Sequence, residues 1–61
     1  MTLSEAQADA YKQLRIGDMR SAVLIMCRWA NDPLITELGL QVLWTGDETV
    51  IRDFIRDFMD E

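Results

Sequence analysis

The segment MRSAVLIMCRWA, residues 19–30, is the most apolar run in the chain, and we expect it to form the central helix of the fold. At 3.6 residues per turn, its apolar residues cover an arc of roughly 200° around the helix axis. A helix on the rim of a small domain needs an apolar stripe of only ~100°, so neighbours are predicted on two sides. The arc consists of Met19, Ala22, Val23, Ile25, Met26, Cys27, Trp29 and Ala30.

The narrow polar side of this helix contains one large apolar residue, Leu24, which lies between Arg20 and Arg28 at a spacing of four residues. Single exposed leucines are common on soluble proteins, so Leu24 can be interpreted as an ordinary surface residue. The alternative is that Leu24 and its two arginines dock into an acidic groove on a partner. The sequence leaves both interpretations open.

A chain of 61 residues is predicted to form a single domain, spanning residues 1–61. Such a domain buries only ~60% of the surface that its unfolded chain exposes, and it often needs a disulfide, a metal or an oligomeric partner. The single cysteine, Cys27, cannot form an intramolecular disulfide, and without any histidine it does not suggest a zinc site. We therefore expect no metal and no cofactor, and stabilisation by a homodimer or by a tight protein partner.

The net charge of −5 is unevenly divided along the chain. Residues 1–30 hold three acids and four bases, and residues 31–61 hold eight acids and two bases, which gives balances of +1 and −6. The acidic half would repel a nucleic-acid backbone, so nucleic acid is not an expected partner. There is no signal-peptide pattern and no apolar run of membrane-spanning length, and a lone buried thiol is typical of a reducing compartment. We therefore expect a cytoplasmic protein that does not enter a membrane.

The residues before the central helix are typical helix ends. Thr2 and Glu5 fit a capping box at the start of a helix over 3–15, and Gly17 is suited to end it. Asp18 can cap the central helix. Because the link between the two helices is very short, they are predicted to form an antiparallel hairpin.

Residues 17–33 resemble the second half of a tetratricopeptide repeat. The resemblance rests on Gly17-Asp18-Met19, Ala22-Val23, Met26 and the closing Asn31-Asp32-Pro33. The preceding residues lack that family's Trp, Leu-Gly and Tyr positions, and the closing proline is displaced by one place. The resemblance therefore implies only a helical hairpin, and peptide binding is not carried over.

The segment 33–44 is predicted to be a helix, with the capping pair Asp32-Pro33 at its start. Apolar residues lie nearly all round it, Glu37 is its only charge, and Gly39 weakens it by roughly 0.5–1 kcal/mol relative to alanine. A strand over 38–44 is the alternative, because every second residue from Leu38 to Trp44 is apolar. No other segment reads as a strand, so this alternative implies pairing with another chain.

The last predicted helix spans about residues 47–59 and repeats the tetrad IRDF, at 51–54 and again at 55–58. Its start is marked either by a capping box of Thr45 with Glu48 or by Asp47. The apolar residues form a continuous stripe. Such a stripe is typical of a core helix, and it would also suit a helix that packs onto a copy of itself or into a partner's groove.

No combination of residues predicts catalysis. The chain has no histidine, the commonest general base, and Ser4 and Ser21 have no plausible base partner. Cys27 lies on the apolar arc, where a thiol is inert unless its pKa is lowered. We therefore expect no enzymatic activity and no catalytic residue.

Our first functional hypothesis is a small acidic module that binds another protein and self-associates through apolar helix faces. Such modules act as regulators, adaptors or inhibitors, and small phage and bacterial regulators are of this kind. The hypothesis follows from the apolar surplus on segment 33–44 in a chain without catalytic groups. The candidate partner-binding residues are Arg20, Leu24, Arg28, Leu40, Leu43 and Trp44.

Two alternative hypotheses involve nucleic acid. In one, the acidic last helix mimics nucleic acid and inhibits a DNA- or RNA-binding enzyme. In the other, the central helix and segment 33–44 form a helix-turn-helix DNA-binding motif, although that segment has no Lys or Arg to neutralise phosphate. The acidic face of the first alternative consists of Asp53, Asp57, Asp60 and Glu61.

The predicted fold is all-α, with three or four short helices in a small antiparallel or orthogonal bundle built on a helical hairpin. Its core is formed by one stripe from each helix. The predicted core residues are Leu14, Ala22, Val23, Met26, Trp29, Leu38, Val42, Ile51, Phe54, Ile55 and Phe58.

Overall fold

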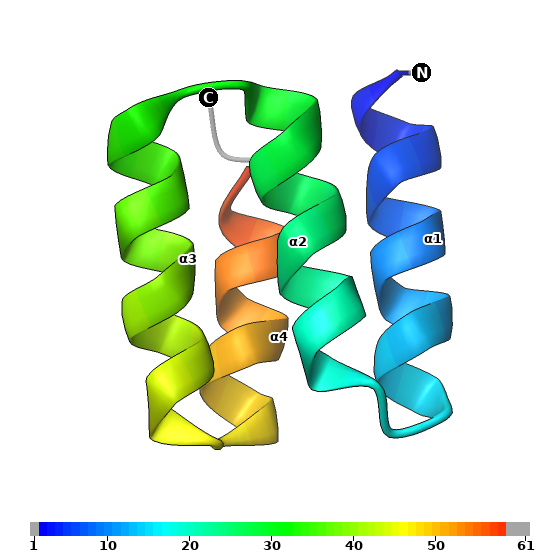
Figure 1. The fold of residues 1–61 in the computed structure, drawn as a ribbon. Helices are drawn as coiled ribbons and strands as arrows, with labels where there is room; N and C mark the ends of the chain where they lie inside the picture. Colours follow the sequence, from blue (N-terminus) through cyan, green and yellow to red (C-terminus); the bar gives the residue numbers. More distant parts are fainter. Residues whose placement is uncertain (1, 59–61) are drawn as a thin grey trace.

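The computed structural model describes residues 2–58, and within that range it contains four α-helices and no strand. They are α1 (Leu3–Arg15), α2 (Met19–Ala30), α3 (Pro33–Thr45) and α4 (Glu48–Asp57). Successive helices run in opposite directions, so the chain forms an up-and-down antiparallel bundle (Figure 1). The all-α prediction is confirmed, and of the two predicted arrangements the bundle adopts the antiparallel one.

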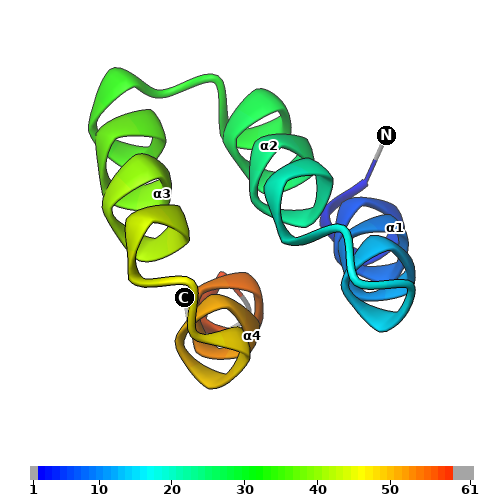
Figure 2. The same ribbon diagram turned by 60° about the horizontal axis from the view of Figure 1, so that its bottom comes forward.

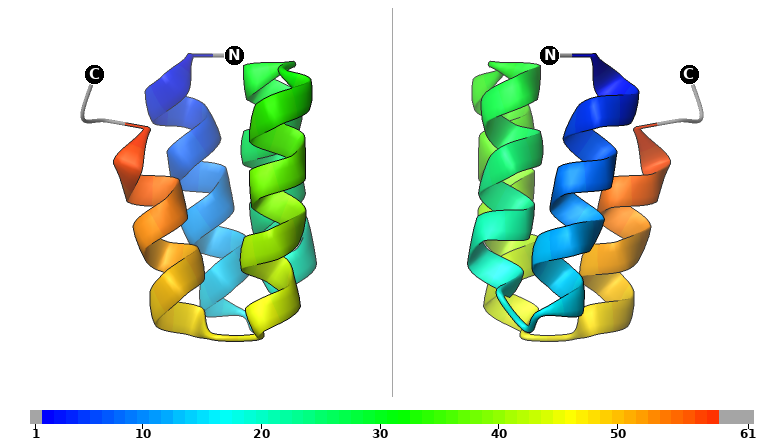
Figure 3. Two further views of the ribbon diagram at one scale, coloured as in Figure 1. Left: turned by 90° about the vertical axis from the view of Figure 1, so that its left-hand side faces the viewer. Right: turned by 90° about the vertical axis from the view of Figure 1, so that its right-hand side faces the viewer.

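The four helices surround a single core. Viewed toward the helix ends, α1 and α3 lie on opposite sides, with α2 and α4 between them (Figure 2). Two further views show the same alternation of direction around the bundle (Figure 3). Helices α2 and α4 each contact all three other helices. The residues of α2 therefore supply the centre of the core, as expected from the wide apolar arc.

The helix ends follow from local hydrogen bonds. Thr2 and Glu5 form the predicted capping box, with N···O distances of 3.1 and 3.2 Å. After α1, the N–H of Gly17 donates to Leu14 and the N–H of Asp18 donates to Gln13, a Schellman motif that requires the positive φ of Gly17 (88°). The Asp18 carboxylate accepts from the Ser21 backbone N–H, which caps α2 and lowers the pKa of Asp18.

Of the two predicted starts of α4, the structure has the one with Asp47 as the cap. Asp47 is its N-cap, accepting from the Thr49 N–H at 2.9 Å, so the capping box of Thr45 with Glu48 was wrong. Thr45 instead belongs to α3, where its hydroxyl donates to the Val42 carbonyl. Helix α4 ends at Asp57 with Phe58 as its C-cap, and residue 59 of the predicted helix lies outside the described residues.

The strand alternative for residues 38–44 was wrong, because these residues lie within α3. Capping interactions at both ends of α3 favour the helix over the strand. The Asp32 carboxylate accepts from the Leu34 N–H at 2.9 Å, and Pro33 occupies the first turn, where its missing N–H has no cost. At the other end, Gly46 has a positive φ of 63° and its N–H donates to the Leu43 carbonyl. Both ends are therefore closed as helix ends.

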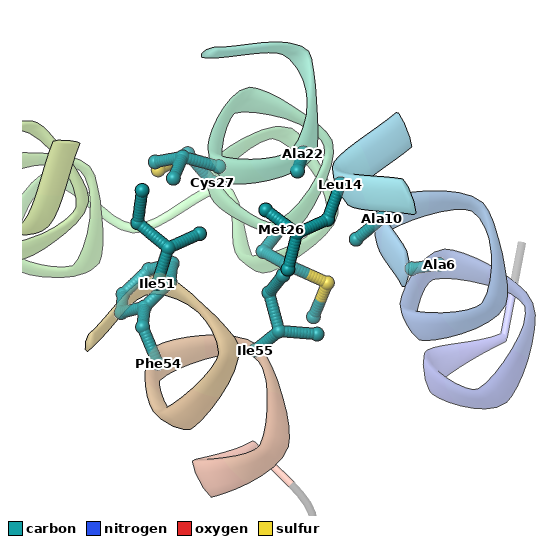
Figure 4. Packing of buried hydrophobic residues seen from close by; sticks show 10 residues of the cluster. Ala6, Ala10, Leu14, Ala22, Met26, Cys27, Ile51, Phe54 and Ile55 are labelled. Carbon is teal, nitrogen blue, oxygen red and sulfur yellow. The ribbon is translucent and has the colours of Figure 1, made fainter. Parts of the chain in front are cut away.

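Seven of the predicted core residues are buried, and two small residues of α1 are buried with them. Met26 lies at the centre of the core, among side chains of α1 and α4 (Figure 4). Ala6 and Ala10 are fully buried, and α1 packs more extensively against α2 than against α4. The buried apolar residues are Ala6, Ala10, Leu14, Ala22, Val23, Met26, Cys27, Ile51, Phe54 and Ile55.

Four predicted core residues are less buried than expected. Val42 and Phe58 are half-buried and pack on the edge of the core. Trp29 is 37% exposed and lies at the rim of the core, where its ring is nearly perpendicular to that of Phe58 at a centroid distance of 6.0 Å. Leu38 is 48% exposed. Its assignment to the core was wrong, as was that of Trp29.

Gly39 explains why Leu38 stays outside. It is the one buried residue of α3, and a Cβ atom added there would lie 2.5 Å from Cys27 Sγ and 3.1 Å from Val23 Cγ1. Phe54 Cζ of α4 would be only 3.3 Å away. The glycine therefore lets the α3 backbone contact side chains of both α2 and α4, and it orients α3 with Gly39 inward and Leu38 outward.

A polar contact joins the first and last helices. The Gln7 amide is buried and its Nε2 donates to the Ile55 carbonyl at 3.0 Å. Ile55 is in the last turn of α4, where carbonyls have no N–H partner within the helix. The side chain of Gln7 thus donates a hydrogen bond to a carbonyl in the last turn of α4. Sequence reasoning missed Gln7 because a polar residue beside an alanine stripe is normally assigned to the surface.

We expect Gly39→Ala to destabilise the protein by about 1–3 kcal/mol, because overpacking against Cys27 and Val23 outweighs the gain in helix propensity. Thermal unfolding followed by circular dichroism would measure the loss. In a Cys27→Ala background the nearest clash is gone, so the same glycine substitution should cost clearly less. Equal losses in both backgrounds would contradict the proposed contact.

Gln7→Ala is expected to cost about 1–3 kcal/mol, since it removes a buried hydrogen bond to the Ile55 carbonyl. Urea unfolding is the measurement. Gln41→Ala serves as the matched control, because Gln41 is an exposed glutamine, and it should change the unfolding free energy by less than about 0.5 kcal/mol. A Gln7 variant as stable as the control would show that the hydrogen bond contributes nothing.

Candidate functional site

The outer side of α3 exposes large apolar side chains. Trp44 is 92% exposed and Leu40 is 54% exposed, and Leu34 and Leu38 are exposed as well. This follows from the composition of α3, which is apolar nearly all round but has only one side turned toward the core. The inward side is taken by Gly39, with Ile35, Val42 and Leu43 half-buried beside it.

An open groove of about 660 Å³ lies between α2 and α3. Leu24, Cys27 and Arg28 line it from α2, and Glu37 and Leu40 line it from α3. The turn between the helices closes one end, through Asn31, Asp32 and Pro33. Leu24 is half-buried in this groove, so it is not an isolated surface leucine.

A second hollow continues the groove along α3. It is lined by Glu37, Leu40, Gln41 and Trp44, and it shares the first two with the groove. The two hollows form one continuous surface with an apolar centre and charged edges. We call this surface the α2–α3 face and define it by Arg20, Leu24, Arg28, Glu37, Leu40 and Trp44.

Five of the six predicted partner-binding residues belong to this face. Leu24, Arg28 and Leu40 meet in the groove, and Trp44 continues from Leu40. Arg20 is exposed at the start of α2, one helical turn from Leu24. The sixth, Leu43, is half-buried and packs against the core, so the structure separates it from the others.

Glu37 was not among the predicted partner-binding residues. The signal was present, since Glu37 is the one charged residue between Pro33 and Thr45. The sequence could not show that Glu37 lines the same groove as Arg28, because this depends on how α3 packs beside α2.

The charges of the α2–α3 face are not paired with one another. Within residues 2–58, neither Arg20, Arg28 nor Glu37 takes part in an ion pair. The ion pairs described by the structure all lie on α4. There Arg52 binds Glu48 at 3.1 Å, and Arg56 lies 3.1 Å from Asp53 and 3.8 Å from Asp57.

The predicted acidic face is accordingly weaker than the sequence suggested. Asp53 and Asp57 share Arg56, and residues 48–58 hold three acids and two bases, a balance of −1. Asp60 and Glu61 lie outside the described residues. A nucleic-acid mimic needs a row of uncompensated negative charge, which the described part of α4 does not present.

The geometry required for a helix-turn-helix motif is also missing. In that motif two helices cross at about 90–120°. Here α2 and α3 run antiparallel, side by side (Figures 1 and 3). The outward side of α3 presents leucine, tryptophan and one glutamate rather than basic residues.

Cys27 lies at the floor of the groove but is buried, with its Sγ 3.9 Å from the Ile35 carbonyl oxygen. Burial raises the pKa of its thiol, because the thiolate is poorly solvated there. In residues 2–58 no group of three or more His, Cys, Asp and Glu side chains is arranged to hold a metal ion. No helix in the same range combines the length and the apolar character needed to span a membrane.

The folded protein is expected to react with a thiol reagent such as DTNB far more slowly than the urea-unfolded chain, because Cys27 is buried with a raised pKa. The neutral thiol is the form that folding favours. Its contribution to stability is therefore complete below the ordinary thiol pKa of about 8.5 and is lost as the pH rises above it. Equal labelling rates in both states would contradict this assignment.

Comparisons with protein-family models, with curated proteins and with solved structures find no match to this chain. The local resemblance to a tetratricopeptide repeat thus has no support from a family match, and the α1–α2 hairpin is the feature of it that the structure confirms.

Proposed function

We propose that the protein is a non-enzymatic protein-binding module that regulates, adapts or inhibits a larger protein through the α2–α3 face. The observation that carries this proposal is the exposed apolar side of α3, where Trp44 is 92% exposed and adjoins a groove. Cys27, a buried free thiol, supports the expectation that the protein acts in the reducing cytoplasm.

The energetics favour a protein partner. Burying one large apolar side chain is worth about 1.5–3 kcal/mol, so an interface that covers Leu40 and Trp44 gains several kcal/mol from these two residues. Tryptophan and arginine are the residues most enriched at interface hot spots. Trp44 and Arg28 both belong to the α2–α3 face, and the apolar centre with charged edges is the composition typical of protein interfaces.

Affinity capture from native lysate, with and without nuclease, tests the proposal. We expect a protein partner that survives nuclease and whose recovery falls at least about tenfold in Trp44→Asp, because the charged side chain cannot be buried. Trp44 is almost fully exposed, so the variant should fold normally, which circular dichroism would check.

Leu38→Asp is the matched control for the capture experiment. Leu38 is an exposed apolar residue of α3, but it lies on the flank toward α4, near Phe54 and Phe58. The control should retain the partner. Partners that disappear with nuclease, or that Trp44→Asp retains, would refute the assignment of this surface.

A further inference from the structure

The α2–α3 face is complementary to itself. Its residues on α2 are Arg20, Leu24 and Arg28, and its residues on α3, read in the opposite direction, are Trp44, Leu40 and Glu37. Helices α2 and α3 run antiparallel (Figure 1) and are joined by a short turn, so residues at similar distances from the turn along the chain lie at similar levels of the bundle. At 1.5 Å per residue, the rows span about 12 and 10.5 Å, so their spacing matches.

Each level joins chemically compatible groups. Arginine and tryptophan attract one another through cation–π interaction, two leucines bury apolar surface, and arginine and glutamate form an ion pair. Within one chain, Arg28 and Glu37 line the same groove without pairing, in the range that the structure describes. The nearby Asp32 carboxylate already caps α3 through the Leu34 N–H. The partners that these charges lack among residues 2–58 are present in a second copy.

We infer that the α2–α3 face binds a second copy of this chain, with α2 of one copy against α3 of the other. A twofold axis parallel to the helices and between the two grooves produces this arrangement. It places Arg28 opposite the other copy's Glu37, Leu24 opposite its Leu40 and Arg20 opposite its Trp44. Each contact then occurs twice, as an isologous interface requires.

The charges of the α2–α3 face favour binding of a second copy, although each chain carries a net charge of −5. The face carries two arginines and one glutamate, and Asp32 at its edge brings the local balance to zero. Two such faces therefore do not repel one another as a whole, while their opposite charges lie in register. A small domain also gains stability from covering an apolar face. The inference rests on the proposed function, since it names the partner of the same face.

Sedimentation equilibrium of the purified protein, combined with charge reversal, tests the arrangement. The wild type should show a concentration-dependent dimer. Arg28→Glu and Glu37→Arg alone should each weaken the dimer about tenfold or more, because each places like charges opposite one another twice. Lys12→Glu on α1 is the control, since it changes the net charge as much as Arg28→Glu but lies outside the face.

The decisive sample is an equimolar mixture of the Arg28→Glu and Glu37→Arg proteins. In the mixed dimer, the glutamate introduced in one chain faces the arginine introduced in the other. The unchanged Glu37 of the first chain then faces the unchanged Arg28 of the second, so both ion pairs are restored. We expect the mixture to dimerise with close to wild-type affinity. If Arg28 and Glu37 instead paired within one chain, mixing would restore nothing, and a mixture that stays monomeric overturns the inference.

The contact between Leu24 of one copy and Leu40 of the other provides a second test. Leu40→Asp should abolish the dimer, whereas Leu38→Asp, at similar exposure on the other flank, should leave it intact. A wild-type protein that is monomeric at all concentrations, or a dimer that Leu40→Asp leaves unchanged, overturns the inference. If the monomer nevertheless binds a different protein and Trp44→Asp abolishes that binding, the proposed function stands without the homodimer. If no partner is captured either, both fail.

Discussion

The bundle depends on the close approach of α3 to α2 and α4 at Gly39. At this point the α3 backbone lies against the Cys27 and Val23 side chains of α2 and against the Phe54 ring of α4, with no room for a Cβ atom. A domain with so few residues has a core only a few side chains wide, so one such contact sets the position of a whole helix. Small residues also fill the core at α1 and α2, where Ala6, Ala10 and Ala22 are fully buried.

The same contact creates the surface on which the proposed function depends. When a glycine occupies the buried position of a helix that is apolar nearly all round, the large apolar residues of that helix must lie elsewhere. Some pack on the edge of the core, as Val42 and Leu43 do. Leu40 and Trp44 face outward beside the groove formed with α2. Close packing in the interior and apolar exposure on the α2–α3 face are thus two results of one helix orientation.

The surfaces of α4 and of the α2–α3 face differ in how their charges are satisfied. On α4, both arginines bind carboxylates of the same helix, so a new partner would have to compete with pairs that already exist. On the α2–α3 face, the arginines and the glutamate surround apolar groups and have no partner among residues 2–58. Unpaired charges at an interface favour partners whose opposite charges lie at matching positions. The reason is that a contact between like charges costs more free energy than an exposed ion pair gains.

The sequence by itself determined the helices and their ends, because caps and turns depend on residues within about four positions of one another. The limits of α1 and α2, the N-caps Asp18 and Asp32 and the antiparallel α1–α2 hairpin were predictable for this reason. Only the tertiary structure decided which side of α3 is buried, since its apolar residues lie nearly all round and give no preferred orientation. That choice exposed Leu38 and turned Leu43 inward, and it brought Glu37 beside Arg28. The pairing of Gln7 with Ile55 joins residues 48 positions apart, and no local pattern can encode such a contact.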